Sequence, residues 1–515
     1  MDVRRGRIFA KMSGDAKIVI AIDIGTTSTK TLAVDLAGQI LGSHSIAYPL
    51  HTPSPGYAEQ DPDVIYNAVM DSVGSLMKQG GFQANEIRCA AFSSANHSLI
   101  LLDANGLPLT PSITWADQRS AAQAERLMND GTGLSVYSRT GTPIHPMSPL
   151  VKLIWMRGER PDLFHSAHHF AGIKEYILNK LFGIMMMDHS IASATGLFHL
   201  ETLTWDKEAL ILAGIREDQL PRLVPSTERI TGLSREAAER MGLGTDTPFI
   251  VGAQDGVLAN LGIGAVEEGV LAVTIGTSGA VRTTVKKPTF DAEGKLFCYA
   301  LTKDHWIVGG PSNNGAIVAR WISDRLYPGK PLDEVLPIAG AVPPGSNGLL
   351  FLPLLSGERA PFWDAEAKGV MFGLTLAHRE PDMLRAAMEG VLFQITAIVS
   401  LMKQAGEKPK EVRASGGFAR SALWCQMMAD MLGVPVRVPE SVESSGLGAA
   451  QLGLYAMDGC RGTLLRWKEQ VGSLYEPDLA NHKLYQKILP LYLNLYDRLK
   501  EPMREISKLQ QTSVG

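Results

Sequence analysis

The chain has 515 residues, of which 45% are hydrophobic and 20% are charged, and its formal net charge at pH 7 is −4. This length exceeds what one hydrophobic core usually holds, so we expect a globular protein with two large domains. The slightly acidic balance gives no indication of nucleic acid or of an anionic membrane as a partner.

The cysteines and the chain ends bear on the compartment. Four scattered cysteines form no Cys-x-x-Cys pair, which suits a reducing compartment. No apolar stretch approaches the length of a membrane span, and residues 1–16 are basic without an apolar signal core. We therefore expect a cytoplasmic protein without a membrane partner, in which residues 1–16 form a flexible segment and residues 506–515 a tail.

The first predicted element is a buried strand over residues 18–24, an apolar run that Asp23 interrupts. A turn with Gly25, Thr26 and Thr27 follows, and then a second strand. Such a turn can direct backbone N–H and hydroxyl groups at one anion, while a carboxylate within a buried strand needs a partner or a metal ion. This favours a phosphate site, and a plain tight turn is the alternative.

Four polar residues follow the next predicted strands. His97 comes after a strand over residues 87–93, and Trp115, Asp117 and Arg119 come after another strand. Imidazole and carboxylate groups can bond hydroxyls, an indole can pack against a carbon face, and a guanidinium can bind a carboxylate through two hydrogen bonds. Taken singly, each could be an ordinary core or surface residue. Their common placement favours a binding site.

The second half begins with an echo of the first. A strand over residues 249–252 leads to Asp255, and residues 269–284 again read as strand, Gly-Thr tip and strand, with Gly276 and Thr277 at the tip. Two such units, one in each half, suggest a duplicated fold with a nucleotide between the halves. We place the boundary near Asp255, which gives domains over residues 17–255 and 256–505.

Other predicted elements follow from hydrophobic periodicity and from glycine positions. We expect a helix over about residues 64–79, a loop over 191–196, a long helix over about 382–403, and a strand over 412–415 that ends in glycines. The helix that follows this last strand is expected to begin at Ser421.

Together these motifs resemble the FGGY family of carbohydrate kinases, from residue 17 to about residue 499. Residues 23–27 and 276–279 resemble its two phosphate motifs, and residues 415–418 resemble its adenosine motif. Residues 147–155 and 369–389 are similar to its two signatures. Within the family the similarity is greatest to gluconokinases, and xylulokinases share the same passages less well. Asn96 stands where related kinases often carry Met.

The resemblance implies an α/β protein with two ribonuclease-H-like (actin-like ATPase) domains and an active-site cleft between them. It implies transfer of the γ-phosphoryl group of ATP, with Mg²⁺, to a small-molecule sugar acid, so that D-gluconate becomes 6-phospho-D-gluconate. The alternatives are a xylulokinase or another FGGY sugar or polyol kinase and, less favoured, an actin-like ATPase switch. The oligomeric state stays open, with a homodimer as one option.

Residue roles carry over from the family motifs. Asp255 would be the catalytic base, although an Asp that merely caps the following helix is the alternative. The expected substrate-binding residues are His97, Trp115, Asp117, Arg119, Lys152 and Asp255, with Arg359 as a further candidate for an anionic substrate. The expected ATP-binding residues are Asp23, Gly25, Thr26, Thr27, Lys30, Gly276, Thr277, Asn314, Gly315, Gly416, Gly417, Phe418 and Ser421. Asp23 and Asp255 would lie near the metal ion, through water or ATP.

Overall fold

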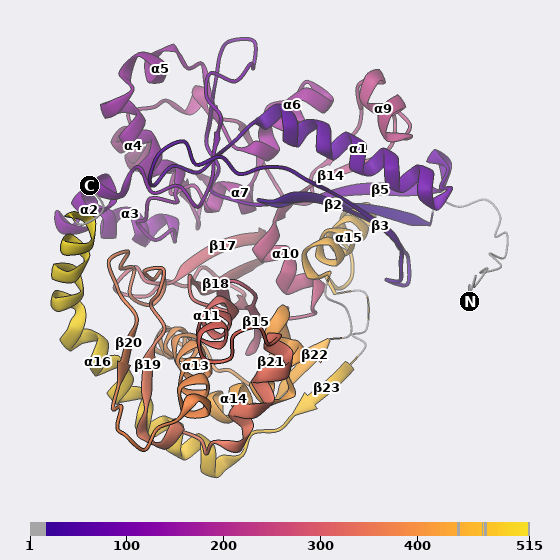
Figure 1. The fold of residues 1–515 in the computed structure, drawn as a ribbon. Coiled ribbons are helices and arrows are strands. Elements are labelled where there is room, and N and C mark those ends of the chain that lie inside the picture. Colours follow the sequence, from indigo (N-terminus) through magenta and orange to yellow (C-terminus); the bar gives the residue numbers. More distant parts are fainter. Residues whose placement is uncertain (1–16, 440–442, 466, 468–470, 513–515) are drawn as a thin grey trace.

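The computed structural model describes residues 17–512, except 440–442, 466 and 468–470. The expectations for residues 1–16 and for the end of the tail, 513–515, lie outside the described residues. Two large mixed sheets, each with helices packed on it, form the two halves of the molecule (Figure 1). The predicted α/β class is confirmed.

The first sheet has six strands and is built from the N-terminal half. In spatial order they are β13 (Arg229–Ile230), β14 (Phe249–Gln254), β5 (Ile87–Ser94), β1 (Ile18–Ile24), β2 (Ser28–Asp35) and β3 (Ile40–Ala47). β1 runs parallel to β5, and β5 runs parallel to β14, so that Asp23 lies opposite Ser93, and Ser94 opposite Gln254. Because the carboxyl ends of parallel strands lie at the same edge of a sheet, Asp23, His97 and Asp255 all lie at that edge.

The second sheet has seven strands and repeats this plan. In spatial order they are β17 (Phe297–Thr302), β18 (His305–Ser312), β16 (Gly279–Val285), β15 (Val270–Ile275), β21 (Glu411–Ser415), β22 (Val436–Pro439) and β23 (Val471–Tyr475). β15 and β16 form an antiparallel hairpin, as β1 and β2 do, and β21 runs parallel to β15. The predicted echo of strand, Gly-Thr tip and strand is therefore present in three dimensions.

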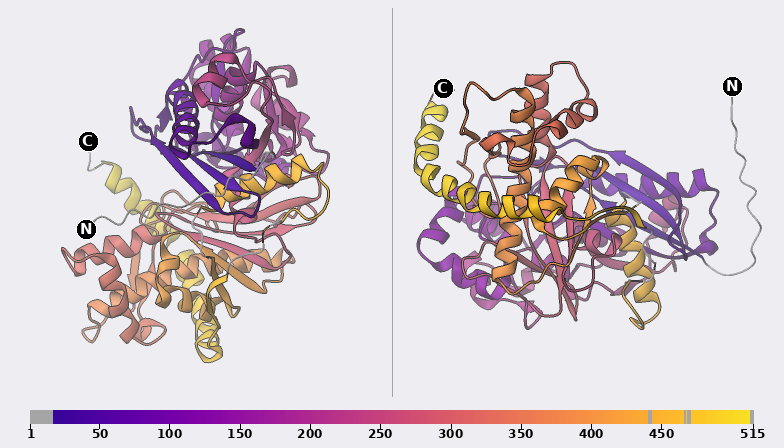
Figure 2. Two further views of the ribbon diagram at one scale, coloured as in Figure 1. Left: turned by 90° about the vertical axis from the view of Figure 1, so that its right-hand side faces the viewer. Right: turned by 90° about the horizontal axis from the view of Figure 1, so that it is seen from below.

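Helices α10 (Asp255–Gly262) and α15 (Ser444–Met457) lie between the two sheets (Figures 1 and 2). Apolar residues of α15 join a core with the face of β1 and β5 that α1 (Pro62–Gly80) does not cover. The two helices can approach closely because Gly448 has no side chain. A Cβ atom there would lie 1.9 Å from the carbonyl oxygen of Leu258. A helix from late in the chain thus completes the first sheet, and the boundary near Asp255 stays a prediction.

The long predicted helix is α13 (Glu380–Gln404), which packs between α11 (Ala316–Leu326), α14 (Ala422–Leu432) and β18. By length and composition α13 is apolar enough to cross a membrane, contrary to the sequence expectation. Most of α13 is buried in the fold, however, which is typical of a core helix.

The remaining elements complete the two halves, and residues 191–193 of the loop expected over 191–196 belong to a short helix, α7 (His189–Ser193). The other helices are α2 (Ala121–Asn129), α3 (Thr132–Thr140), α4 (Pro149–Glu159), α5 (Pro161–Ser166), α6 (Ile173–Phe182), α8 (Lys207–Ala213), α9 (Arg235–Met241), α12 (Leu332–Val335) and α16 (Leu479–Thr512). The minor strands are β4 (Glu59–Gln60), β6 (Ile100–Leu102), β7 (Ser112–Ile113), β8 (His169–Ala171), β9 (Met186–Asp188), β10 (Phe198–His199), β11 (Thr204–Trp205), β12 (Arg222–Val224), β19 (Leu350–Leu352) and β20 (Val370–Phe372).

Candidate active site

Two cavities meet at the tip of the β15–β16 hairpin. One, of about 1050 Å³, lies within the second half and is called the outer cavity below. The other, of about 340 Å³, lies between the two halves and is called the inner cavity. Gly276 lines both cavities, so a group bound in one can reach a group bound in the other across this residue.

The inner cavity takes its walls from both halves. Its polar and aromatic lining residues are Thr26, Asn96, His97, Trp115, Gln254 and Asp255 from the first half, with Arg282, Phe297, Tyr299 and Arg359 from the second. Of the expected substrate-binding residues, the structure thus brings His97, Trp115 and Asp255 together on the wall.

Asp255 is the first residue of α10, at the end of β14. Its Oδ1 accepts a hydrogen bond from the N–H of Gly256 at 2.5 Å, so the side chain also supports the helix start. Burial and the nearby charge of Asp23 raise the pKa of Asp255 to about 6, against the opposing effect of Arg282. A carboxylate with this pKa is mostly ionised at neutral pH and can accept a proton.

Asp23 lies at the end of β1, where hydroxyl groups hold its carboxylate. Ser93 donates to Oδ1 at 2.6 Å, and Ser445 of α15 donates to Oδ2 at 2.7 Å. Burial nevertheless raises the pKa of Asp23. The charge of Asp23 in turn raises the pKa of Asp255, and such a pair of carboxylates suits a divalent cation that keeps water and phosphate ligands.

Hydrogen bonds from two aromatic side chains fix the tip of the β1–β2 hairpin. Tyr48 donates to the carbonyl of Gly25 at 2.6 Å, and the indole of Trp115 donates to the hydroxyl of Thr26 at 2.8 Å. The N–H of Gly25 closes its own turn, as does that of Gly276 in the second hairpin. Thr26, Thr27 and Thr277, which follow these glycines, remain as candidate phosphate donors at the two tips.

Lys30 was expected to lie near phosphate. The structure pairs its ammonium with Glu443 at 2.5 Å, and its side chain is 37% exposed. Lys30 lines neither cavity. Its charge is therefore shared with a carboxylate on the loop before α15.

His97 and Asn96 form the end of the inner cavity that faces β17. His97 has a left-handed backbone conformation, with φ of 62°, and its Nε2 lies 3.3 Å from the hydroxyl of Tyr299. Burial holds the pKa of His97 well below its usual range, so the ring is neutral. Asn96 donates to the side-chain carbonyl of Gln254 and so ties the loop after β5 to β14.

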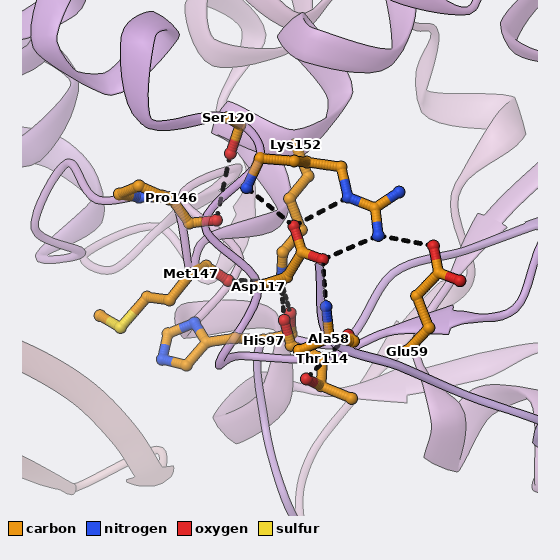
Figure 3. Close-up of polar contacts among 10 residues, drawn as sticks. Ala58, Glu59, His97, Thr114, Asp117, Ser120, Pro146, Met147 and Lys152 are labelled. Carbon is orange, nitrogen blue, oxygen red and sulfur yellow. Dashed lines mark hydrogen bonds and ion pairs between the residues drawn. The ribbon is translucent and has the colours of Figure 1, made fainter. Parts of the chain in front are cut away.

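Lys152 does not line the inner cavity but lies behind residues that do. The residue is 1% exposed, and its ammonium donates to three backbone carbonyls, those of His97 at 2.6 Å, Thr114 at 2.8 Å and Met147 at 2.8 Å (Figure 3). All three donors of an ammonium are thereby used. Lys152 thus links three loops, and its expected contact with substrate stays a prediction.

Asp117 and Arg119 also lie behind the wall. The Arg119 guanidinium pairs with Asp117 at 2.7 Å and with Glu59 at 2.5 Å, and it lies 3.7 Å from the ring centroid of Tyr57. Asp117 is fully buried and also accepts from the N–H of Ala58 at 2.7 Å. Two protein carboxylates thus hold Arg119 in an internal ion pair, and its pairing with a substrate carboxylate stays a prediction.

Two other arginines, Arg282 and Arg359, line the inner cavity. Arg282, on β16, was not singled out from the sequence, although a lone charged residue in an otherwise buried strand was a usable signal. Arg359 donates from Nε to Asn313 at 2.8 Å, and its guanidinium lies 5.2 Å from the ring centroid of Trp115. Burial lowers the pKa of Arg359 to about 10, so it stays charged at neutral pH.

Five of the expected nucleotide residues line the outer cavity, namely Gly276, Thr277, Gly417, Phe418 and Ser421. Gly416 directly precedes Gly417 and has a φ of 88°. A side chain there would begin 2.6 Å from the carbonyl oxygen of Ile275. Only glycine fits this left-handed position against β15. The loop can therefore turn sharply at the sheet edge.

Asn314 and Gly315 lie beneath the β15–β16 hairpin rather than on a cavity wall. Asn314 is fully buried and donates to the carbonyl of Gly357 at 2.7 Å, and a side chain at Gly315 would begin 2.6 Å from the carbonyl oxygen of Gly276. They support the hairpin tip. Charged residues of the outer cavity that sequence reasoning missed are Arg320, Asp324, Lys330, Asp333 and Arg420.

Comparisons with known proteins agree with this geometry. Residues 18–262 match the N-terminal domain of the FGGY family of carbohydrate kinases, and residues 271–457 match its C-terminal domain. The chain is 45% identical over 506 residues to the gluconokinase of Bacillus subtilis, covering 96% of this chain and 98% of that protein. It is 29% identical over 492 residues to the xylulose kinase of the same organism, covering 94% and 98%.

Solved structures show the same fold. A ligand-bound xylulose kinase from Lactobacillus acidophilus has a TM-score of 0.92 at 36% identity, covering 95% of this chain and 100% of that one. A gluconate kinase from Lactobacillus acidophilus has a TM-score of 0.90 at 37% identity, covering 94% and 98%. The molecule is thus a carbohydrate kinase with two actin-like ATPase domains. More particularly, the chain belongs to the FGGY family of carbohydrate kinases.

Proposed function

We propose that this kinase transfers the γ-phosphoryl group of ATP to the C6 hydroxyl of D-gluconate in the cytoplasm, giving 6-phospho-D-gluconate and ADP. The observation that carries the proposal is the 45% identity to a gluconokinase along nearly the whole chain, against 29% to a xylulose kinase of the same organism. The two arginines on the inner cavity wall support it, because a cationic wall suits an acid better than a neutral sugar.

In this mechanism the sugar acid occupies the inner cavity with its C6 hydroxyl at Asp255. The carboxylate of Asp255 orients that hydroxyl and accepts its proton as the oxygen attacks phosphorus. His97 and Trp115 contact the sugar, and they belong to loops that Lys152 joins from behind. Because the transition state of phosphoryl transfer is loose, this positioning is the main contribution of the protein.

The nucleotide occupies the outer cavity, with its phosphates at the hairpin tips. Gly417 and Phe418 line the adenosine end, and Thr277 lines the phosphate end beside Gly276. Asp23 and Asp255 fit a Mg²⁺ ion held mostly through ATP oxygens and water, since each carboxylate lies in the field of the other. Such an ion supplies charge neutralisation for the phosphates.

A xylulokinase is the second candidate, and the TM-score of 0.92 to a xylulose kinase favours it. A ketopentose has no carboxylate, so it would leave the arginine pair of the inner cavity without a counter-ion. An ATPase switch is not favoured, because both halves match domains of carbohydrate kinases. Steady ATP hydrolysis indifferent to every sugar would revive it.

The product tests the proposal. The purified chain is incubated with ATP, Mg²⁺ and D-gluconate, and the products are resolved by ³¹P NMR with proton coupling. We expect a phosphate monoester coupled to the two protons of C6. A monoester at another carbon would contradict the proposed position of transfer, and the absence of any monoester on gluconate would contradict the proposed substrate.

A further inference from the structure

The inner cavity carries unbalanced charge. Its charged lining residues, within the described part of the chain, are one acid, Asp255, and two bases, Arg282 and Arg359. His97 is neutral, since burial holds its pKa far below the usual range. At neutral pH the wall therefore has an excess of one positive charge, and a neutral sugar would leave this excess in place.

Arg282 lacks a partner in the described structure. Its side chain makes no hydrogen bond or ion pair with any described residue, and its Nη1 atom is buried without an acceptor. The guanidinium lies beside Gly256, where a side chain would begin 3.3 Å from Nε. Arg282 is partly buried, and a guanidinium with a buried nitrogen that lacks an acceptor is costly, so a bound anion would stabilise it.

Arg359 approaches the same space from the loop between β19 and β20. Asn313 and the carbonyl of Ser312 hold it from one side, and Trp115 lies against its face. The charge of Arg282 helps to lower the pKa of Arg359, and both arginines lie in the field of the Tyr299 hydroxyl. The two guanidinium groups therefore repel each other, and an anion beside them would relieve this repulsion.

We propose that Arg282, assisted by Arg359, binds the carboxylate of the sugar acid and is the residue that selects an acid over a neutral sugar. This inference rests on the proposed function and adds the group that determines its specificity. A guanidinium can bind a carboxylate through two parallel hydrogen bonds, which no hydroxyl or keto group reproduces. Arg282 thereby takes the role that the sequence suggested for Arg119.

The competing role for Arg282 is stabilisation of the phosphoryl group in transfer, because Asp255 is near it. Gly276 and Thr277 of the second phosphate motif line the outer cavity, whereas Arg282 and Arg359 line only the inner cavity. An anion shared by both arginines thus belongs to the substrate rather than to ATP. The two roles differ in one measurable respect. If Arg282 binds the carboxylate, its replacement lowers kcat/KM more for a charged substrate than for a neutral one.

The test compares D-gluconate with D-gluconamide, in which a neutral amide replaces the carboxylate and the C6 hydroxyl is unchanged. For the wild-type protein we expect kcat/KM to be about 100-fold higher for gluconate, as is usual for a buried charge pair. The Arg282→Met variant should lose about 100-fold on gluconate and less than about 3-fold on gluconamide. Arg282→Lys, which keeps the charge but not the fork, should lie between them.

Calorimetric titration of each compound without ATP gives a readout independent of turnover, and should show the same loss of preference in Arg282→Met. Arg235→Met, at a surface position 89% exposed, controls for the loss of an arginine. Equal losses on gluconate and gluconamide would overturn the inference and leave the proposed function intact. A wild-type protein that phosphorylates a neutral ketose and not gluconate would overturn both.

Discussion

The ammonium nitrogen of Lys152 lies 2.6 Å from the carbonyl oxygen of His97, and this bond joins α4 to the inner cavity wall. The same nitrogen reaches the carbonyls of Thr114 and Met147. Because His97, Met147 and Trp115, which follows Thr114, all line the cavity, the one buried nitrogen of Lys152 fixes three loops around it.

Replacement of Lys152 by methionine should loosen this wall. Three buried carbonyls lose a charged donor, so we expect the free energy of unfolding to fall by about 3 kcal/mol. We expect KM for the sugar acid to rise about 10-fold while KM for ATP changes little, since the outer cavity is built from other residues. Chemical denaturation and steady-state kinetics measure the two effects, with the exposed Lys207→Met as control. Equal rises in both KM values would contradict a role confined to the sugar wall.

Replacement of Asp255 by asparagine should remove the proton acceptor and keep the shape of the side chain. We expect kcat to fall by about 100-fold or more, which is the usual contribution of a general base. ATP affinity, measured by calorimetric titration, should change by less than about 3-fold, because the outer cavity is unaltered. Turnover close to that of the wild-type protein would show that another group accepts the proton.

Replacement of Arg119 by methionine tests its structural role. The change leaves Asp117 buried without its counter-ion, so we expect a loss of about 3 kcal/mol in stability. Activity of the folded fraction should decline by a similar factor on gluconate and gluconamide, since Arg119 is occupied by protein carboxylates. A loss confined to gluconate would instead restore Arg119 as the carboxylate-binding residue.

Replacement of Gly416 by alanine should impair the nucleotide site. The left-handed backbone and the 2.6 Å approach to the Ile275 carbonyl force the loop before Gly417 to shift. We expect KM for ATP to rise about 10-fold and the thermal midpoint to fall by several degrees. Gly158→Ala is the matched control, because nothing lies within 4 Å of a side chain there. Unchanged ATP kinetics in Gly416→Ala would remove this loop from the nucleotide site.

The elements that carry the two hairpins could be predicted from sequence because each is local. A β-branched run, a Gly-Thr tip and a second strand are visible within about twenty residues, and β1–β2 and β15–β16 follow this pattern. The orientation of α15 could not be predicted, because its apolar residues would suit either sheet. Its packing on β1 depends on close contact with α10 far along the chain.

The partners of the polar side chains in the site could not be predicted from sequence. Arg119 has the chemistry of a carboxylate-binding residue, but its second partner, Glu59, comes sixty residues earlier in the chain. Lys152 likewise satisfies its charge on backbone carbonyls, which no residue pattern reveals. Arg282 differs from both, because what distinguishes it is the lack of a hydrogen-bonded partner among the described residues. Such a lack is visible only in the folded structure.

The most direct measurement is ADP release by the purified protein with Mg²⁺-ATP against gluconate, xylulose, ribulose, glycerol and no sugar. We expect rapid release with gluconate and, with the neutral compounds, release close to that of the sugar-free control. Rapid release with xylulose and none with gluconate would contradict the proposed function, and would leave the arginine pair of the inner cavity without the anion that we assign to it.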